Sequence, residues 1–593
     1  NNSRISLSNN GGEATNTIFG YQAGNSIHAS SGMNTFIGHQ VADATMTADA
    51  DENTAVGHLA LSGLTSGEKN IAIGSYSGIN ITSGDENVLV GRSAGNNHNS
   101  SDLVAVGTAA LASINNATAD GTVGVGYQAL TALTTGAENT AVGYYALATQ
   151  TGAGSNTAVG WQAGRYLGDD GGSNHSSFNT IIGRSAMGGG HTSTPAGNTA
   201  HLNTAIGHGV LGGGTGSTTN LTATNNTAIG YASMNVATSA SNNVTIGHGA
   251  GQSVTTGSSN TVIGSLAGDA LTSTTNCTLV GYAAGGAINH TDATGTVCVG
   301  LNAGKTITSG QGNTAIGTSA LEDSSDSDYS TALGYAALAN QAGTSGTVAN
   351  TGIGSFSLGS ITTGTHNIGL GSNTLFTATT ALRNVAIGFN TMTDTKAATA
   401  VADCVAIGYE ALKGNSSTTS TNVSGTVAIG KDALKVCVTG ARNVAIGYQA
   451  SQALTSGNDN TSVGYNALDE LVDGNRNTSV GSYAMGDVVG GTTSDGSSDN
   501  TALGYLAGGG TWANEDCSNI VAIGASALSG ALQGDGADGT VSIGKSALAS
   551  LTSGSGNIAI GFNSGYNLTT NVENTYLGYE SGASAGGNVH NYN

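Results

Sequence analysis

The amino-acid sequence predicts an all-β protein, a parallel β-solenoid of about 31 coils, and three observations lead to this fold class. A short motif recurs along nearly the whole chain of 593 residues, most often at a spacing of 17 residues. Gly is abundant at 96 residues, Pro occurs once, as Pro195, and only 8% of the residues are charged. No helical heptad interrupts the repeat. Repeated units that are too small to bury an apolar face alone indicate coils that stack on one another.

Each repeat opens with a short strand that leads to a glycine at a corner. The residue three before this Gly is β-branched in all 31 units, the residue one before it is always apolar, and 22 units carry Asn four before it. In the unit of Gly143 these residues are Thr140, Val142 and Asn139. Asn at one place in successive coils predicts a ladder of side-chain amides. The β-branched and apolar sites share one strand parity, so we expect both to point into the coil.

The residue between these two sites is small in 24 units, usually Ala, and by the same parity it is expected to point outward. Because exposed strand positions disfavour Ala, an outward stripe of small residues predicts close packing against another chain. The corner Gly permits backbone conformations closed to other residues. A second short segment and a polar turn such as Thr-Ser-Gly complete the coil. The position directly after the corner is aromatic in 14 units, and the pattern leaves open whether these rings stack on one another or on sugars.

The motif Asn-Thr/Val-Ala-Ile/Val-Gly-x-x-Ala, as in Asn139 to Ala146, resembles the head repeat of YadA-type trimeric autotransporter adhesins. Its longer form, NTAIGYxAL followed by TSGxxN, is similar to repeats of phage tail-fibre proteins. The resemblance covers Asn16 to Gly582. It implies a left-handed β-roll, a homotrimer packed about one axis, and an attachment role on a virion or cell surface. In such a trimer, Ala141, Ala315 and Ala445 would lie near the axis.

The repeat unit is longer than the usual coil of the autotransporters, and the sequence shows no neck motif, heptad stalk or C-terminal membrane anchor. These differences favour a non-enzymatic, extracellular phage tail fibre or comparable appendage, held by other fibre proteins, over a bacterial autotransporter-type adhesin, which stays as an alternative. A third possibility is an ice-binding solenoid. Thr occupies the site three before Gly in 17 units, but that site is expected to face inward. The predicted organisation is a lead-in at 1–15, tandem repeats at 16–582 and a tail at 583–593.

A glycan or protein receptor is expected to bind the long coils, because loops on rigid scaffolds carry function. Three successive spacings between Gly160 and Gly230 are 23, 24 and 23 residues, and a further long coil follows Gly504. The candidate contacts in these loops are Asp169, His175, His191, His201 and Trp512. Trp512 lies on a Gly-rich loop, where its indole could stack on a sugar or fold back onto the coils.

Composition excludes several other functions. The formal charge of −22 leaves no cationic footprint for nucleic acid, and no apolar run is long enough to span a membrane. The five cysteines contain no CxxC pair and are interpreted as small core residues. The strings GRSAG and GTVSIGKS match catalytic motifs only through the repeat glycines Gly91 and Gly544, so no catalytic residue is predicted. No metal or cofactor is predicted either, apart from a weak possibility of Ca²⁺ at acidic turns such as Glu322 to Asp328.

Overall fold

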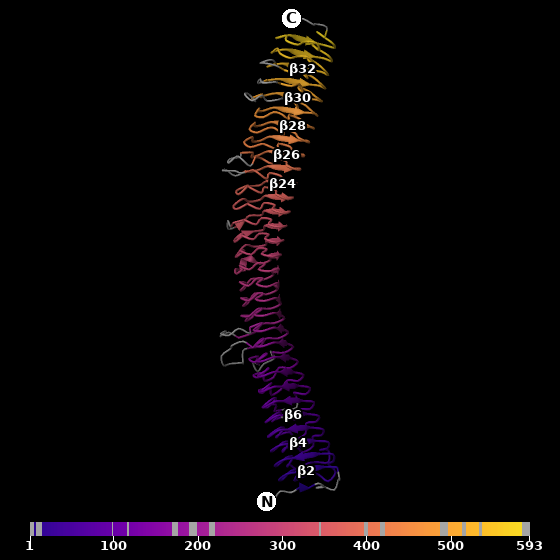
Figure 1. Cartoon of the computed structure of the whole chain (residues 1–593), viewed down its shortest axis with the longest axis vertical. Coiled ribbons are helices and arrows are strands. Elements are labelled where there is room, and N and C mark those ends of the chain that lie inside the picture. The colour runs from indigo at the N-terminus through magenta and orange to yellow at the C-terminus, as the bar shows by residue number, and fades with distance from the viewer. Residues whose placement is uncertain are drawn as a thin grey trace. The chain divides into compact units, whose positions relative to one another are not determined.

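The structure, a computed structural model, describes residues 5–6, 15–97, 99–115, 118–168, 176–188, 198–212, 220–342, 346–395, 401–415, 422–486, 496–512, 517–532 and 537–583. The chain divides into two compact units, unit 1 (Asn1–Thr296) and unit 2 (Val297–Asn593). Each unit is a parallel β-solenoid, in which one three-residue strand per coil lies against the strand of the next coil (Figure 1). The described residues contain 15 such strands in unit 1 and 16 in unit 2, which confirms the predicted fold class and the 31 coils.

The strands of unit 1 are β1 (Ile5–Ser6), β2 (Thr17–Phe19), β3 (Thr35–Ile37), β4 (Thr54–Val56), β5 (Ile71–Ile73), β6 (Val88–Val90), β7 (Val104–Val106), β8 (Val123–Val125), β9 (Thr140–Val142), β10 (Thr157–Val159), β11 (Thr180–Ile182), β12 (Thr204–Ile206), β13 (Thr227–Ile229), β14 (Val244–Ile246), β15 (Thr261–Ile263) and β16 (Thr278–Val280). A 3₁₀ turn, η2 (Thr291–Ala293), follows them. Strand β1 pairs antiparallel with β2, and the described pairs from β2 to β16 are parallel and in register.

The strands of unit 2 are β17 (Val297–Val299), β18 (Thr314–Ile316), β19 (Ser327–Asp328), β20 (Thr331–Leu333), β21 (Gly346–Thr347), β22 (Thr351–Ile353), β23 (Ile368–Leu370), β24 (Val385–Ile387), β25 (Val405–Ile407), β26 (Val427–Ile429), β27 (Val444–Ile446), β28 (Thr461–Val463), β29 (Thr478–Val480), β30 (Thr501–Leu503), β31 (Val521–Ile523), β32 (Val541–Ile543), β33 (Ile558–Ile560) and β34 (Thr575–Leu577). Strands β19 and β21 form a small second sheet, and the others pair in register with the next coil.

The side-chain parity of the strands is the reverse of the prediction. The middle residue of each strand is buried inside the coil, and the first and third residues face outward with partial exposure. Ala141, Ala315 and Ala445 are each 0% exposed within a single chain, so the prediction that they line a trimer axis is wrong. The interior of a coil is narrow and accepts small residues there, whereas β-branched residues fill the flat outer surface of the sheet in cross-strand rows.

Large residues at the middle position follow the same rule. Phe36, Leu89 and Ile181 occupy this position and are completely buried. Glycine makes room for two of them in the preceding coil: a Cβ on Gly78 would lie 2.9 Å from Leu89, and one on Gly164 would lie 3.0 Å from Ile181. Most other coils carry a Leu, Met or Ala where these glycines occur. The core therefore conserves volume between neighbouring coils.

The predicted ladder of buried amides is confirmed. In the coils of β27 to β29, the Oδ1 atoms of Asn443, Asn460 and Asn477 each accept hydrogen bonds from the backbone N–H and the side-chain amide of the Asn in the next coil, and the last of these acceptors serves Asn500 in the coil of β30. The same amide also donates to a turn carbonyl, as Asn460 does to Gly474 at 2.7 Å. The ladder has a direction, because each oxygen faces only the following coil.

At four places the ladder stops at a residue without an amide, and the next coil then carries Thr. These pairs are Leu103 and Thr122, Cys277 and Thr296, Cys404 and Thr426, and Ile520 and Thr540. The terminating residue still donates its backbone N–H to the preceding Asn, as Leu103 does to Asn87 Oδ1 at 3.0 Å. At two of these places the Thr hydroxyl then accepts from the backbone N–H of the next Asn: Thr122 from Asn139 and Thr426 from Asn443, both at 3.4 Å. The sequence shows that Thr follows these ladder breaks in the next coil, but the reason for this pairing is clear only from the hydrogen bonds of the ladder.

Candidate functional site

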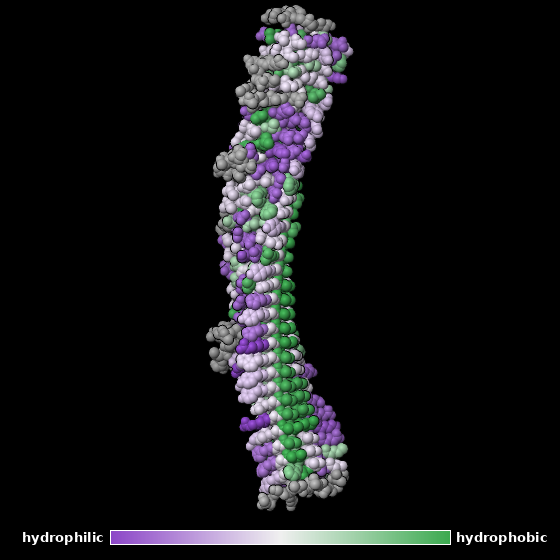
Figure 2. Space-filling view, in the orientation of Figure 1, coloured by the Kyte–Doolittle hydropathy of each residue, from purple (hydrophilic) through white to green (hydrophobic). Residues whose placement is uncertain are grey.

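The outward strand face, formed by the first and third residues of the strands, is the most distinctive surface of each unit. In β5, Ile71 and Ile73 are 39% and 42% exposed, and in β27 Ile446 is 37% exposed. Figure 2 shows the result as a hydrophobic band along one edge of unit 1. Monomeric proteins rarely expose a contiguous apolar patch of more than about 300–600 Å². The outward strand face is therefore a candidate interaction surface.

A second surface feature is the rung position, the residue directly after each corner Gly. In unit 1, successive rungs stack ring on ring: Tyr127 lies 5.2 Å from Tyr144, and Tyr231 lies 5.2 Å from His248, with interplanar angles of 14° and 8°. A cation takes the place of a ring in both units. Arg184 lies 4.9 Å from the Trp161 ring, and Lys431 in unit 2 lies 5.3 Å from the Tyr448 ring. Rings inside these stacks contact each other through their faces, which favours the structural interpretation over sugar stacking at those rungs.

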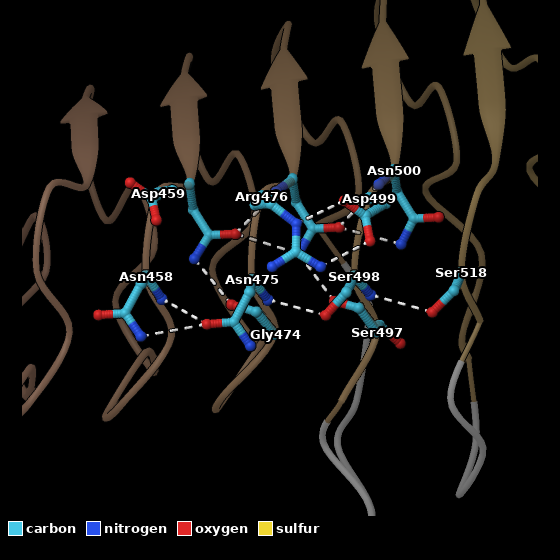
Figure 3. A network of polar contacts seen from close by, with 12 residues as sticks. Asn458, Asp459, Gly474, Asn475, Arg476, Ser497, Ser498, Asp499, Asn500 and Ser518 are labelled. Atoms are coloured by element: carbon cyan, nitrogen blue, oxygen red, sulfur yellow. Dashed lines mark hydrogen bonds and ion pairs between the residues drawn. The ribbon is translucent and has the colours of Figure 1, made fainter.

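Unit 2 carries a ladder of alternating charges at the residue before the ladder Asn (Figure 3). Four successive coils carry Arg442, Asp459, Arg476 and Asp499 at this place, and the last three are drawn in Figure 3. Arg442 donates to both carboxylate oxygens of Asp459 at 2.7 and 2.8 Å, and Arg476 binds Asp499 in the same way at 2.6 and 2.8 Å. One residue earlier, Asn458 donates its backbone N–H and its amide to Asn475 Oδ1. Such paired rows oppose a slip of one coil against its neighbour.

The charge ladder predicts that the Asp459 carboxyl titrates at a lower pH than an ordinary aspartate. The hydrogen bonds from Arg442 lower the pKa of the Asp459 carboxyl below its usual value of 3.8. The stability that this pair contributes is complete above the pKa of the unfolded chain and is lost as the pH falls through the lower pKa of the folded chain. We expect NMR titration of the Asp459 carboxyl to give a lower midpoint in the native protein than in the Arg442→Ala variant. Because both side chains are exposed, the melting temperature at pH 7 should hardly change.

The matched control is Arg442→Lys, which keeps the charge but loses the two parallel N–H donors. Its midpoint should fall between those of the native protein and Arg442→Ala. Equal midpoints in all three proteins would show that the bidentate pair does not form in solution.

Of the receptor-contact residues predicted from the sequence, the structure describes Trp512 and His201. Trp512 is only 1% exposed, so the possibility that its indole is presented to a sugar is wrong, and the alternative that it folds back onto the coils is confirmed. It packs beside Gly508, at the place where other coils bury a Leu, because the cavity behind a Gly-rich segment accepts a large side chain. His201 is partly exposed, and its Nδ1 lies 3.1 Å from the carbonyl of Thr199. Asp169, His175 and His191 lie outside the described residues.

The other predicted chemical features have structural explanations. All five cysteines are free and buried, and burial raises the pKa of Cys277 and Cys404 to about 11 and that of Cys437 to about 12, so these thiols stay protonated. In the acidic turns, Asp326 accepts from Thr308 and Ser309, and Asp328 accepts from the N–H of Gln311. No group of three or more His, Cys, Asp or Glu side chains that could hold a metal ion occurs within the described ranges.

The two catalytic-motif strings have the geometry of the repeat. Gly91 and Gly544 are corner glycines with φ of +136° and +130°, and Val541–Ile543 is strand β32. Turns follow each corner, where a nucleophile elbow or a phosphate-binding loop would need the start of a helix. Over the part of the chain that the structure describes, no helix has the length and apolar character needed to cross a bilayer.

The missed feature is therefore the outward strand face, whose signal in the sequence is the unbroken β-branched and apolar pair in every unit. Comparison of the chain with protein-family models and with curated proteins found no match, so the surface itself has to carry the functional argument.

Proposed function

We propose that this chain is a structural segment of an extracellular attachment fibre, of the kind found in phage tail fibres, and that copies of the chain associate through the outward strand face. The function is non-enzymatic: the stacked coils provide length and rigidity, and the fibre connects other appendage proteins to a receptor on a cell surface. The same architecture would serve a cell-anchored adhesin, which remains the alternative. The observation that carries the proposal is the exposed apolar band that each unit presents along its strands.

The size of the outward strand face supports self-association. A three-residue strand is about 10 Å long and successive strands lie about 4.8 Å apart, so the 15 coils of unit 1 present a surface of about 700 Å². A stable interface buries about 800 Å² on each partner. Charged side chains are absent from all first and third strand positions, although the chain has 36 acidic residues elsewhere. This depletion is typical of the centre of a protein interface. Three copies around one axis, as the resemblance implies, would cover the face of every copy.

Lysine substitutions on the outward strand face test this proposal. The variant carries Lys at the third strand position of four successive coils, at Val159, Ile182, Ile206 and Ile229. The native particle should have a mass of three times the chain's 57.7 kDa by light scattering. The variant should dissociate to single chains with unchanged circular dichroism, because the charges repel across the interface without entering the core.

The control places the same four lysines on the same coils at outward turn positions, at Ser155, Phe178, Leu202 and Asn225. All four sites are partly or fully exposed and have positive φ, so the turn geometry is matched. This control should stay trimeric. A native chain that is monomeric in solution, or a face variant that stays assembled, would contradict association through the outward strand face.

One observation favours ice binding as a second candidate function. The first strand residue is Thr in β9 to β13, five successive coils, and these hydroxyls face outward beside a row of Val and Ile, contrary to the inward placement expected from the sequence. Such an array repeats about every 4.8 Å across strands and about 7 Å along them, which is the scale of the ice lattice. A monomeric native chain with thermal hysteresis that the four face lysines abolish would support this candidate over the fibre.

A further inference from the structure

The stack of rung residues in unit 1 is interrupted by one small residue between two rings. Tyr231 and His248 stack at 5.2 Å with an interplanar angle of 8°. The next rung is Ser265 and the following one is Tyr282, which is 52% exposed. Within the described part of unit 1, Tyr282 stacks on no other ring. The sequence His248, Ser265, Tyr282 therefore leaves a ladder with one rung missing.

The backbone fixes the width of this opening. Strands β14, β15 and β16 pair in register, and the N–H groups of Leu266 and Ala283 donate to the carbonyls of His248 and Ser265 at 2.9 and 3.0 Å. The rungs are thus consecutive and cannot slide. His248 is parallel to Tyr231, so its other face points along the ladder toward Ser265. Two steps between strands put the His248 and Tyr282 rungs about 10 Å apart.

Two other interruptions of the stack are covered by a neighbouring ring. At Ser75, the adjacent Tyr76 lies edge-on to His58 at 5.2 Å. At Ser482 in unit 2, the adjacent Tyr483 contacts Tyr465 at 5.3 Å. The residue next to Ser265 is Leu266, and its side chain packs against Gly249, at the side of the ladder. The opening at Ser265 is therefore bounded by two rings and an apolar side wall.

We propose that this opening, the Ser265 slot, binds one pyranose ring of a cell-surface glycan between His248 and Tyr282. The proposal rests on the attachment function and names its ligand class. A flat aromatic ligand in contact with both rings would need only about 7–8 Å, at 3.5–4.0 Å per contact, and would leave space. A chair-shaped sugar ring is thicker and fits the opening better. The Ser265 hydroxyl, at the floor of the slot, can donate a hydrogen bond to the sugar or accept one from it.

The sandwich geometry also selects the sugar. Both faces of the ring must be apolar, because each packs on an aromatic side chain. In the β-gluco configuration every hydroxyl is equatorial and both faces carry only C–H groups. An axial hydroxyl, as in galactose or mannose, would be buried against a ring without a partner. The slot should therefore bind β-linked glucose oligomers in preference to their galactose or mannose counterparts.

Calorimetry and NMR with cellotetraose, using mannotetraose as the comparison ligand, test the slot on the full chain. The native protein should bind cellotetraose at least tenfold more tightly than mannotetraose. Ser265→Tyr fills the missing rung with a residue that many other rungs carry, and it should raise the Kd for cellotetraose at least tenfold while the fold is kept. Tyr282→Ala should have a similar effect. Ser372→Tyr, the same substitution at a rung of unit 2 without rings on both sides, should leave the affinity unchanged.

A rescue experiment separates a lost slot from a damaged coil. In the Ser265→Tyr background, Tyr231→Ser opens a slot of the same width between His208 and His248, and cellotetraose binding should return. Equal binding by native protein and Ser265→Tyr, or no binding by the native protein, would overturn the slot. The native particle mass is measured in parallel: a trimer that binds no cellotetraose would refute the slot alone, whereas a monomer would refute the proposed fibre.

Discussion

Replacing Gly143 by alanine should unfold the coils of β9 and β10 locally. Gly143 has φ of +143°, and a Cβ at this position would lie 2.2 Å from the carbonyl oxygen of Gly160, the corner of the next coil. The obstacle is backbone, so no side-chain rotation relieves it. Strain in this backbone region costs about 1–3 kcal/mol by itself, and the steric contact adds to it. We expect a loss of about 3 kcal/mol or more, seen as at least 100-fold faster amide exchange in the peptides that contain β9 and β10.

The matched control for this substitution is Gly121→Ala. Gly121 also has positive φ, at +69°, but nothing lies within 4 Å of the added Cβ. Its cost should be limited to about 1–2 kcal/mol for an alanine in the left-handed region. Similar exchange rates in the two variants would show that the corners are looser than the close approach of Gly143 to Gly160 indicates.

Removing one amide from the buried ladder should have the second-largest effect. Asn460 is 1% exposed, and its side chain serves the backbone N–H of Asn477 and the carbonyl of Gly474 at 2.9 and 2.7 Å. Asn460→Ala leaves both backbone groups buried without these partners. Each such group costs about 1–3 kcal/mol, so the expected loss is about 2–6 kcal/mol. Hydrogen exchange in β28 and β29 measures it, since the stability of a repeat protein is local.

The native sequence already contains ladder positions that lack the amide and are followed by Thr in the next coil. The double variant Asn460→Leu, Asn477→Thr reproduces the Leu103 and Thr122 pair, in which the Thr hydroxyl accepts from the next Asn. It should be more stable than Asn460→Leu alone, which is a non-additive result. If the second substitution destabilises the protein further, the pairing of ladder breaks with Thr has no energetic basis.

The repeat, the strands and the amide ladder could be predicted because each depends on a residue type at a fixed place in the period. The direction of the strand side chains could not. The prediction placed Thr140 and Val142 inside because apolar residues usually face a core. In this fold the middle residue of the strand, usually a small one such as Ala141, packs inside the coil beside a Leu from the second segment, and the β-branched and apolar residues on either side of it face outward. Alternation along a strand shows which residues share a face, but it does not show which face points inward. The inward face is usually identified as the apolar one, and this criterion fails here because both faces carry apolar residues.

The binding residues were harder to predict for a different reason. The sequence leaves the placement of Trp512 open, because glycines around an indole are compatible with an exposed loop and also create the space that buries it. The Ser265 slot depends on the absence of an aromatic side chain at one rung position. Only the stacking of the neighbouring rings in the structure indicates that this absence leaves an opening between them. A search for contact residues considers the groups that are present, so it does not detect such an opening.

The in-register pairing of coils also determines how each unit would respond to a pulling force. The hydrogen bonds that join β9 to β10 and β10 to β11 run from coil to coil. Tension in that direction is carried by one interface after another, so the coil with the weakest interface separates first and its neighbours stay intact. A coil of 17 residues would release roughly 50–60 Å of chain as it unravels. An appendage built from such coils would lengthen in steps under load and dissipate work at each step before its attachment fails.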